Sequence, residues 1–484
     1  HAPRQTGKTT FLLSWMREIN AGGEAVSCYV SVERCQGVAE PERAMPSICD
    51  AIREYTSMLR LAIPDTSAVN ANSMLSDMLI RWSALVAPKP LVVLFDEVDV
   101  LTDDVMVSFL RQLRGGFASR GVGLFPVSIA LVGMRDLKDY TIKAKDGKPV
   151  NPGSPFNIKE DSAMLGNFTK GDVARLFAQR TAETGQQITP EALGYVYEQS
   201  QGQPWIVNSL FMRATLRVLD GESTETVTLA HVEEARQQMV AARETHLDSL
   251  GERLRDPRIR RVIEFIITGD VNPNMGRTNP DVELAMDLGL VSWSNSQGFT
   301  IANPIYEEIL TRFLNSGYHD NLPPPSSWQW QKPDGTLDMD SLLREFQSFW
   351  QANSEAWEEM SSYSEAFPHL LLMAFLQRVT NGEGRIEREY AAGRGRMDLA
   401  LLYKGKRHII EVKLLRSRQS LEKVRELGVQ QILRYRDRFS PPLGGGAPPG
   451  CYLLIFDRRP EAAQRSWSER LRWSQEGEVT VVEC

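Results

Sequence analysis

The chain has 484 residues, of which 42% are hydrophobic and 24% are charged, so it is a folded globular protein of about three to four domains. Its net charge of −7 excludes general adhesion to nucleic acid through a uniformly basic surface. The five cysteines form no CxxC pair and have no His cluster beside them, so we expect neither a zinc site nor disulfides. No signal peptide and no apolar run of about 18 residues is present, which predicts a cytoplasmic protein without membrane contact.

A phosphate-binding pattern opens the chain. HAPRQTGKTT matches GxxxxGK[ST], except that Ala2 stands at the position of the first Gly. In this pattern Gly7 lets backbone N–H groups turn around phosphates, Lys8 places a charge on the outer phosphates, and Thr9 offers a hydroxyl to Mg²⁺. The apolar residues after Thr10 have helical spacing, so a helix N-terminus is expected to point at the phosphates. We predict that Gly7, Lys8, Thr9 and Thr10 bind the nucleotide.

An acidic strand end supplies the second half of this site. LVVLFDEVDVL contains an apolar strand, Leu91 to Phe95, that ends in Asp96 and Glu97. A buried parallel strand delivers such carboxylates at its C-terminal end. Asp96 is expected to hold Mg²⁺ through water, and Glu97 to polarise the water that attacks ATP. A third strand, VSIALVG, ends just before Arg135, which either stabilises the transferring phosphate or is a solvated loop residue.

Four segments, PRQTGKT, LFDEVD, GMRDL and GQPWIVN, together resemble a bacterial family in the AAA-like and STAND-like branch of P-loop ATPases. The resemblance implies a parallel-sheet ATPase core over residues 1–159 and a helical lid over residues 160–245. The chain starts at His1, inside the loop motif and without the strand that should precede it, so we expect the core to be truncated at its N-terminus. GQPW resembles the Gly-x-Pro motif of such lids, which implies that Pro204 lies near the nucleotide.

Residues 246–318 show helix, helix, short hairpin and helix, the order of a winged-helix domain, with GLVSWSNSQGFTIAN as the wing. Such a domain either binds DNA or packs against its neighbours. The segment contains no obvious basic recognition helix, which favours packing. Residues 319–345 include three consecutive prolines and few aliphatic residues, and therefore predict a semi-rigid linker to a last domain at 346–484.

This last domain contains a second set of chemically active residues. GRGRMDLALLYKGKRHIIEVKLLR reads as two strands joined by a Lys-Gly-Lys turn. Glu411 and Lys413 are two residues apart and share one face of the second strand, while Asp398 starts the neighbouring strand. Asp398 and Glu411 can bind Mg²⁺, which would activate a water and a scissile phosphate, while Lys413 would orient the water or stabilise charge. The alternative is a surface hairpin with an ion pair, but the surrounding apolar residues favour a buried strand.

The order helix, three strands, helix and strand, with Asp…Glu-x-Lys on strands two and three, resembles the restriction-endonuclease-like α/β fold of the PD-(D/E)xK nuclease superfamily. Gln431 and Tyr435 share one face of the following helix and resemble the accessory QxxxY motif of RecB-like members. The Pro that often precedes the motif Asp is absent, and Arg396 and Met397 stand there instead. Glu365, near the start of the preceding helix, is either a further metal ligand or a helix-capping carboxylate.

Positive charge gathers around the predicted hairpin. Residues 381–440 contain 15 Lys and Arg against 8 Asp and Glu, a surplus of seven positive charges. Beside a metal site, these side chains predict a phosphate-binding rim rather than a merely solvated face. The residues concerned are Arg385, Arg388, Arg394, Arg396, Lys404, Lys406 and Arg407.

The sequence therefore predicts an ATP-binding and ATP-hydrolysing protein whose Mg²⁺-dependent nuclease domain cuts nucleic acid, with DNA preferred, under nucleotide control. The alternative is a STAND-like signalling or scaffolding ATPase whose nuclease-fold domain only binds nucleic acid or a partner. A DNA-translocating motor is disfavoured because no helicase motif follows the DEVD strand. We expect nucleic acid as the partner, while a homo-oligomer and a protein trigger stay open. The family resemblance suggests a prokaryotic protein of the mobile-element or phage-defence kind.

Overall fold

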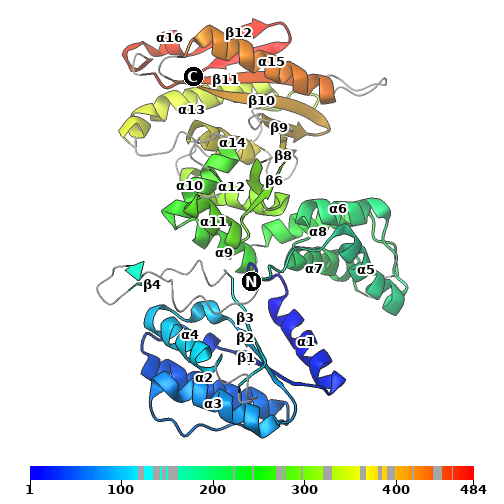
Figure 1. Ribbon diagram of the computed structural model, residues 1–484. Helices are drawn as coiled ribbons and strands as arrows, with labels where there is room; N and C mark the ends of the chain where they lie inside the picture. The colour runs from blue at the N-terminus through cyan, green and yellow to red at the C-terminus, as the bar shows by residue number, and fades with distance from the viewer. Residues whose placement is uncertain are drawn as a thin grey trace. The chain divides into compact units, whose positions relative to one another are not determined.

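The computed structural model describes most of the chain, which divides into two compact units (Figure 1). One unit holds residues 1–239 and 286–289, and the other holds residues 240–285 and 290–484. The described residues are 1–117, 125–134, 142–143, 149–150, 162–221, 224–242, 245–268, 276, 279–295, 298–319, 330–359, 367–379, 384–389, 398–416, 419–439, 450–459 and 462–484. Within these residues, no helix combines the length and the apolarity that a membrane span needs.

A parallel sheet forms the centre of the first unit, with strands in the order β1-β2-β3. Its elements are β1 (Val26–Ser31), β2 (Leu91–Asp96), β3 (Ser128–Leu131), α1 (Lys8–Gly22), α2 (Pro41–Met58), α3 (Ala71–Val86) and α4 (Asp103–Phe117). The short elements are η1 (Glu33–Cys35), η2 (Val98–Val100), β4 (Ile142–Lys143) and β5 (Pro149–Val150). Every residue of β2 is buried, because helices cover both faces of the sheet.

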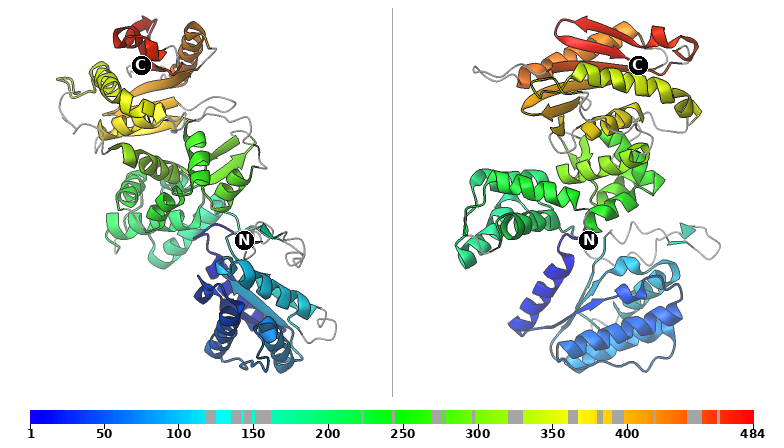
Figure 2. Two further views of the ribbon diagram at one scale, coloured as in Figure 1. Left: turned by 90° about the vertical axis from the view of Figure 1, so that its left-hand side faces the viewer. Right: turned by 180° about the vertical axis from the view of Figure 1, so that it is seen from behind.

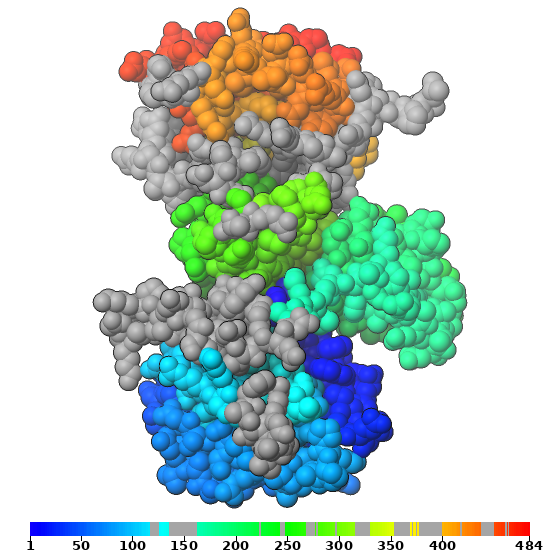
Figure 3. All heavy atoms as spheres, in the orientation of Figure 1, coloured from blue at the N-terminus to red at the C-terminus, as the bar shows by residue number. Residues whose placement is uncertain are grey.

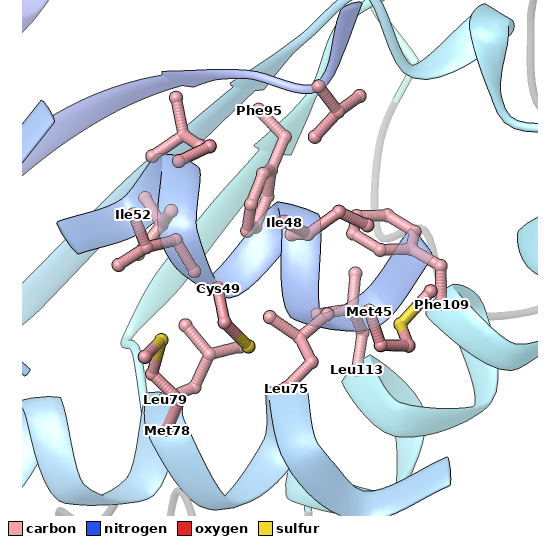
Figure 4. Close-up of a cluster of buried hydrophobic side chains, with 14 of the residues drawn as sticks. Met45, Ile48, Cys49, Ile52, Leu75, Met78, Leu79, Phe95, Phe109 and Leu113 are labelled. Carbon is pink, nitrogen blue, oxygen red and sulfur yellow. The ribbon is translucent and has the colours of Figure 1, made fainter. Parts of the chain in front are cut away.

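The two faces of β2 pack against different helices. Val92 and Leu94 lie with Leu12 and Met16 of α1, whereas Phe95 lies in a larger cluster with α2, α3 and α4. Figure 4 shows this cluster, in which side chains of three helices and of Phe95 point toward one another. The alternation along β2 fixes the register of the strand, and therefore fixes where its C-terminal carboxylate emerges.

Four further helices and a π-helical turn follow in the described part of the first unit. They are α5 (Lys170–Thr184), α6 (Pro190–Ser200), α7 (Pro204–Arg213), η5 (Ala214–Val218) and α8 (Leu229–Ala241). Thr169 caps α5 and Thr189 caps α6, because their hydroxyls accept hydrogen bonds, each 3.2 Å long, from the backbone N–H of Asp172 and of Ala192 respectively. The helical segments predicted for the lid therefore begin at these threonines.

Gly202 makes a close backbone contact just before α7. Its φ of +73° is left-handed, and an added Cβ would meet the carbonyl oxygen of Phe168. We expect Gly202→Ala to destabilise the first unit by roughly 1–2 kcal/mol from backbone strain alone, with a further cost for moving Phe168. Thermal unfolding measures this loss. Gly194→Ala is the control, since Gly194 lies in α6 with open space around it. This variant should increase the free energy of unfolding by up to about 1 kcal/mol. Equal unfolding temperatures for both variants would contradict the expectation.

The second unit begins with helices and a hairpin in the predicted order. The elements are α9 (Thr245–Arg253), α10 (Pro257–Thr268), α11 (Pro280–Asp287), β6 (Val291–Ser294), β7 (Gly298–Ile301) and α12 (Pro304–His319). The α11 sequence PDVELAMD contains three acidic residues and no Lys or Arg. α12 packs against α14 (Phe367–Val379). The assignment as a winged helix stays a prediction.

A six-stranded mixed sheet forms the C-terminal part, in the order β12-β13-β11-β10-β9-β8. Its strands are β8 (Gly384–Glu389), β9 (Asp398–Tyr403), β10 (Lys406–Leu415), β11 (Gly450–Asp457), β12 (Arg472–Glu476) and β13 (Val479–Glu483). Its helices are α13 (Met339–Glu359), α15 (Leu421–Phe439), α16 (Trp467–Arg470) and the 3-10 turn η6 (Ala462–Gln464). β10 pairs in parallel with β11 and antiparallel with β9.

Helices cover both faces of this sheet. Figure 1 shows α15 in front of the strands, and the reverse view in Figure 2 shows α13 on the opposite side. α15 packs on Leu453 and Ile455, while Phe346 and Trp350 of α13 contact Phe456. The outer side of α15 lies at the surface of the molecule (Figure 3). β10 is therefore enclosed, as predicted for the strand that carries Glu411 and Lys413.

The predicted fold class, a multidomain α/β protein with a parallel sheet, is confirmed. One boundary differs from the predictions, and two strands were not predicted. α13 starts at Met339, so the last residues of the range predicted as linker are helical, and Asp338 stabilises this start by accepting from the Ser341 N–H at 3.3 Å. β12 and β13 extend the sheet beyond the strand CYLLIFD, where the sequence analysis made no prediction.

His408 is a buried histidine on β10, beside Tyr452. Burial, and then the charges of Lys332 and Lys406, lower the pKa of His408 from 6.5 to about 4. Because the unfolded chain binds more protons between these two pKa values, stability is full above pH 6.5 and falls as the pH drops toward 4. We expect a loss of up to about 3 kcal/mol across this window.

Scanning calorimetry at pH 7.5 and pH 5 measures this pH dependence. His408→Leu has no proton to gain, so its unfolding temperature should fall much less between the two pH values than that of the wild type. A parallel decrease in both proteins would assign the acid sensitivity to other groups.

Candidate functional site

The first candidate site is the loop before α1. Gly7 is the N-cap of α1 and has a φ of +86°, and Gln5 is also left-handed, with a φ of +58°. Successive turns of this kind direct backbone N–H groups toward one point, as phosphate binding requires. Ala2, at the position of the first Gly of the motif, is fully buried, and its N–H donates to the Gly133 carbonyl at 3.2 Å. The loop therefore lies at the C-terminal end of β3.

Lys8 is held by its own loop. Its Nζ donates to the carbonyl oxygens of Ala2 and Pro3, both at 2.8 Å. Burial lowers the pKa of Lys8, although the carboxylates of Glu97, Asp99 and Asp96 act in the opposite direction. The ammonium is thus positioned above the loop, where phosphate oxygens can replace the two carbonyls.

Thr9 and Asp96 come together as predicted. The Thr9 hydroxyl donates to Asp96 Oδ2 at 2.7 Å, which joins the loop to the end of β2. Tyr29 of β1 was not predicted as a site residue, but its buried hydroxyl donates to the same Oδ2 at 3.1 Å. Thr9 and Asp96 are the residues that would hold Mg²⁺ with a nucleotide, and their oxygen ligands suit this cation. Tyr29 and Thr9 both donate to the carboxylate of Asp96 and so fix its position.

Glu97 follows Asp96 in a left-handed conformation, with a φ of +61°, and its N–H donates to Asp96 Oδ1 at 2.9 Å. Burial, followed by the charges of Asp99 and Asp96, raises the pKa of Glu97, which makes it a better proton acceptor. Asp99, also missed by the sequence analysis, accepts from the Met134 N–H at 3.3 Å. Arg135, the next residue, lies outside the described residues.

The remaining predicted nucleotide residues lie on two helices. Thr10 is exposed in the first turn of α1. Pro204 is the first residue of α7 and is buried. Gln203, next to it, donates to the Gln5 carbonyl at 3.3 Å, so the GQPW motif lies beside the loop, as its resemblance to the lid motif implies.

The second candidate site lies on β10 and α15. Glu411 is 1% exposed and Lys413 is 6% exposed, and Lys413 Nζ forms a short ion pair with Glu411 Oε1. The same ammonium donates to Gln431 Oε1 at 2.7 Å. Tyr435, one turn further along α15, is buried in the cluster that this helix forms with β10 and β11. The structure therefore brings together Glu411, Lys413 and the QxxxY residue Gln431.

The backbone of Asp398 lies next to this group. β9 and β10 are joined by Lys404 and Gly405, both left-handed, which is the two-residue turn that suits an antiparallel hairpin. The register pairs Leu399 with Ile410, so Asp398 occupies the position across from Glu411. Glu365 and the side chain of Asp398 lie outside the described residues. Among the described side chains, no three His, Cys, Asp or Glu residues gather as a metal site would require.

The residues around Glu411 that the structure describes can bind a divalent cation. Glu411 offers a buried carboxylate oxygen, the donor type that Mg²⁺ prefers, and the neighbouring register position carries a second acidic residue. Glu411 and Asp398 would hold the ion. When bound, it would supply charge that polarises a scissile phosphate and lowers the pKa of a water.

The predicted basic rim divides into two groups. Lys404 and Lys406 are exposed at the hairpin turn, about 17 Å along β10 from Glu411 at the usual rise per residue. They lie at the opposite end of the strand and do not belong to the same rim. Arg388 on β8 pairs with Leu399, near the Asp398 end. The side chains of Arg385 and Arg388, and all of Arg394 and Arg396, lie outside the described residues.

Residues 363–440 match the model of a family described as the PD-(D/E)XK nuclease superfamily. The match covers α14, β8, β9, β10 and α15, and confirms the predicted resemblance of the C-terminal part. None of the curated proteins compared with the chain matches it.

Several solved structures resemble the N-terminal part. The Walker-type ATPase PABY2304 of Pyrococcus abyssi is 15% identical, with 64% of this chain and 89% of that chain covered and a TM-score of 0.44. Cdc6p from Pyrobaculum aerophilum is 13% identical, with 65% and 86% covered and a TM-score of 0.35. The RuvB Holliday junction branch migration motor of Thermotoga maritima is 13% identical, with 62% and 93% covered and a TM-score of 0.30. The role of each residue in the first site rests on the contacts of this chain.

Proposed function

We propose that the protein is an ATP-controlled, metal-dependent nuclease that cuts nucleic acid, with DNA as its first substrate class. The observation that carries the proposal is the buried contact of Lys413 with Glu411 and Gln431, directly across from Asp398. An ion pair costs free energy to bury, so its enclosure on a strand needs a reason beyond stability. Phosphodiester cleavage supplies this reason, because it requires carboxylate oxygens for a metal and a cation for developing charge.

Each residue of the second site has a role in this chemistry. Glu411 and Asp398 would hold the divalent ion and so place the scissile phosphate. Lys413, held by Gln431 at 2.7 Å, would stabilise negative charge on the phosphate oxygens during attack by water. Because the site is largely enclosed by the sheet and α15, this charge interaction is stronger than it would be in open water.

The first site supplies the proposed control by nucleotide. Lys8 and the loop would bind the phosphates, Thr9 and Asp96 would hold Mg²⁺, and Glu97 would accept a proton from the attacking water. The alternative, a signalling ATPase whose C-terminal domain only binds nucleic acid, predicts the same ATP binding but no cleavage.

Degradation of supercoiled plasmid and of a structured RNA tests the proposal. We expect cleavage of DNA with Mg²⁺ or Mn²⁺, none with EDTA, and a change in rate when ATP is added. Binding of DNA without cleavage in either metal would favour the signalling alternative. Cleavage at the same rate with and without ATP would remove nucleotide control from the proposal while leaving the nuclease in place.

A further inference from the structure

Gln203 makes two contacts through one side-chain amide. Its Oε1 accepts from the backbone N–H of Ile206 at 2.6 Å and caps α7, while its Nε2 donates to the Gln5 carbonyl at 3.3 Å. Gln203 is 5% exposed, so its side-chain amide is largely shielded from bulk water. The first turn of α7 and the phosphate loop are therefore tied through this one group, across 198 positions of sequence.

The contact with Gln5 bears on the donors of the loop. A trans peptide is planar, so the carbonyl of Gln5 and the N–H of Thr6 point in opposite directions across one rigid unit. When Gln203 bonds to the Gln5 carbonyl, the N–H of Thr6 points to the side of the loop that faces away from Gln203. In a phosphate-binding loop, the direction of such N–H groups decides affinity. The Thr6 hydroxyl donates to the Pro3 carbonyl at 2.9 Å and steadies the same turn.

Gln203 itself stands on a fixed backbone. The Gly202 N–H donates to Ser200 Oγ at 3.1 Å, and the Phe168 N–H donates to the Gly202 carbonyl at 2.8 Å. The Gln203 N–H donates to the Ser200 carbonyl at 3.0 Å. Because the backbone is held on both sides, little conformational freedom remains to be lost when the amide engages the loop.

We propose that Gln203 is a positioning residue of the nucleotide site. It orients the peptide between Gln5 and Thr6 toward the phosphates, and it transmits the occupancy of the loop to α7. This role rests on the proposed binding of nucleotide by the loop. It concerns the residue between the Gly and the Pro of the lid motif, and it is distinct from the expected contact of Pro204 with the nucleotide.

Two substitutions separate this role from the helix cap. Gln203→Asn keeps an amide that can cap α7 but is too short to reach Gln5. Gln203→Glu keeps the length and the capping oxygen but places a carboxylate against the Gln5 carbonyl. Gln187→Glu is the matched control, since Gln187 is exposed between α5 and α6 and, among the described residues, its amide donates to nearby Gly185.

Calorimetric titration with MgATP and MgADP, together with hydrogen exchange of α7, tests the proposal on the full chain. Gln203→Asn should bind about 5- to 10-fold more weakly than the wild type at a nearly unchanged unfolding temperature, and Gln203→Glu should bind more weakly still. Nucleotide should slow exchange in the first turn of α7 in the wild type and in Gln187→Glu, but not in the Gln203 variants.

The outcomes distinguish a failure of the proposed nucleotide binding from a failure of the role of Gln203. A wild-type chain that binds neither nucleotide would overturn the proposed function of the loop, and the role of Gln203 with it. A wild type that binds, beside Gln203 variants of equal affinity or equal protection of α7, would overturn only the role of Gln203.

Discussion

Lys413→Ala should reduce metal-dependent DNA cleavage by about 100- to 1000-fold, because it removes the cation that stabilises charge on the phosphate. The ammonium contacts Glu411 and Gln431 within the enclosed strand, and no other described Lys or Arg makes these contacts. Plasmid degradation measured under single-turnover conditions reports the loss. The proposed ATP binding uses residues of the other compact unit and should stay at the wild-type level.

Two controls accompany this variant. Lys406→Ala makes the same chemical change at the exposed turn of the hairpin and should leave the rate within about twofold. Because Lys413→Ala leaves the Glu411 charge buried, it can lower stability by about 3–5 kcal/mol. The double variant Glu411→Gln with Lys413→Gln removes both charges together and should be folded but inactive. A folded Lys413 variant that cuts DNA as fast as the wild type would refute the nuclease assignment.

Lys8→Ala should weaken the binding of MgATP and MgADP by about 100-fold or more, because two charge-assisted hydrogen bonds to phosphate oxygens are lost. The carbonyls of Ala2 and Pro3, which now accept from Lys8, face the loop and cannot replace a cation. Calorimetry or the displacement of a fluorescent ADP analogue measures this affinity on the full chain.

Lys89→Ala is the matched control for Lys8→Ala. Lys89 is exposed just before β2, at the end of the sheet that lies away from Asp96, so its removal should leave affinity unchanged. ATP turnover at the wild-type rate in Lys8→Ala would remove the P-loop assignment, whatever the result for the nuclease.

Local pattern predicted the central part of both sites. GKT and the acidic end of an apolar strand were sufficient to predict the contact of Thr9 with Asp96, because parallel strands deliver their C-terminal residues to one edge. The alternation in RHIIEVKLL was sufficient to place Glu411 and Lys413 on one buried face, since side chains on a strand repeat every two residues. The tight turn at Lys404 and Gly405 then determined which residue lies opposite Glu411.

Contacts that depend on the three-dimensional neighbour of a strand or loop could not be predicted in this way. Tyr29 bonds to Asp96 only because β1 lies beside β2, and no local pattern states which strands are adjacent. The available signal was a tyrosine hydroxyl in the apolar strand VSCYVS, which needs an acceptor when buried. β12 was missed because RWSQE, at the edge of the sheet, has too few apolar residues to mark a strand.

The two carbonyls that hold Lys8 make nucleotide binding an exchange of ligands. A ligand has to form stronger hydrogen bonds with the Lys8 ammonium than the carbonyl oxygens of Ala2 and Pro3 already form. Neutral groups or a single weak anion do not meet this condition. Under the proposed function, the loop would select for the number of negative charges on the ligand before any contact with the base. A nucleoside should leave the lysine on its two carbonyls, whereas a chain of phosphates should replace them.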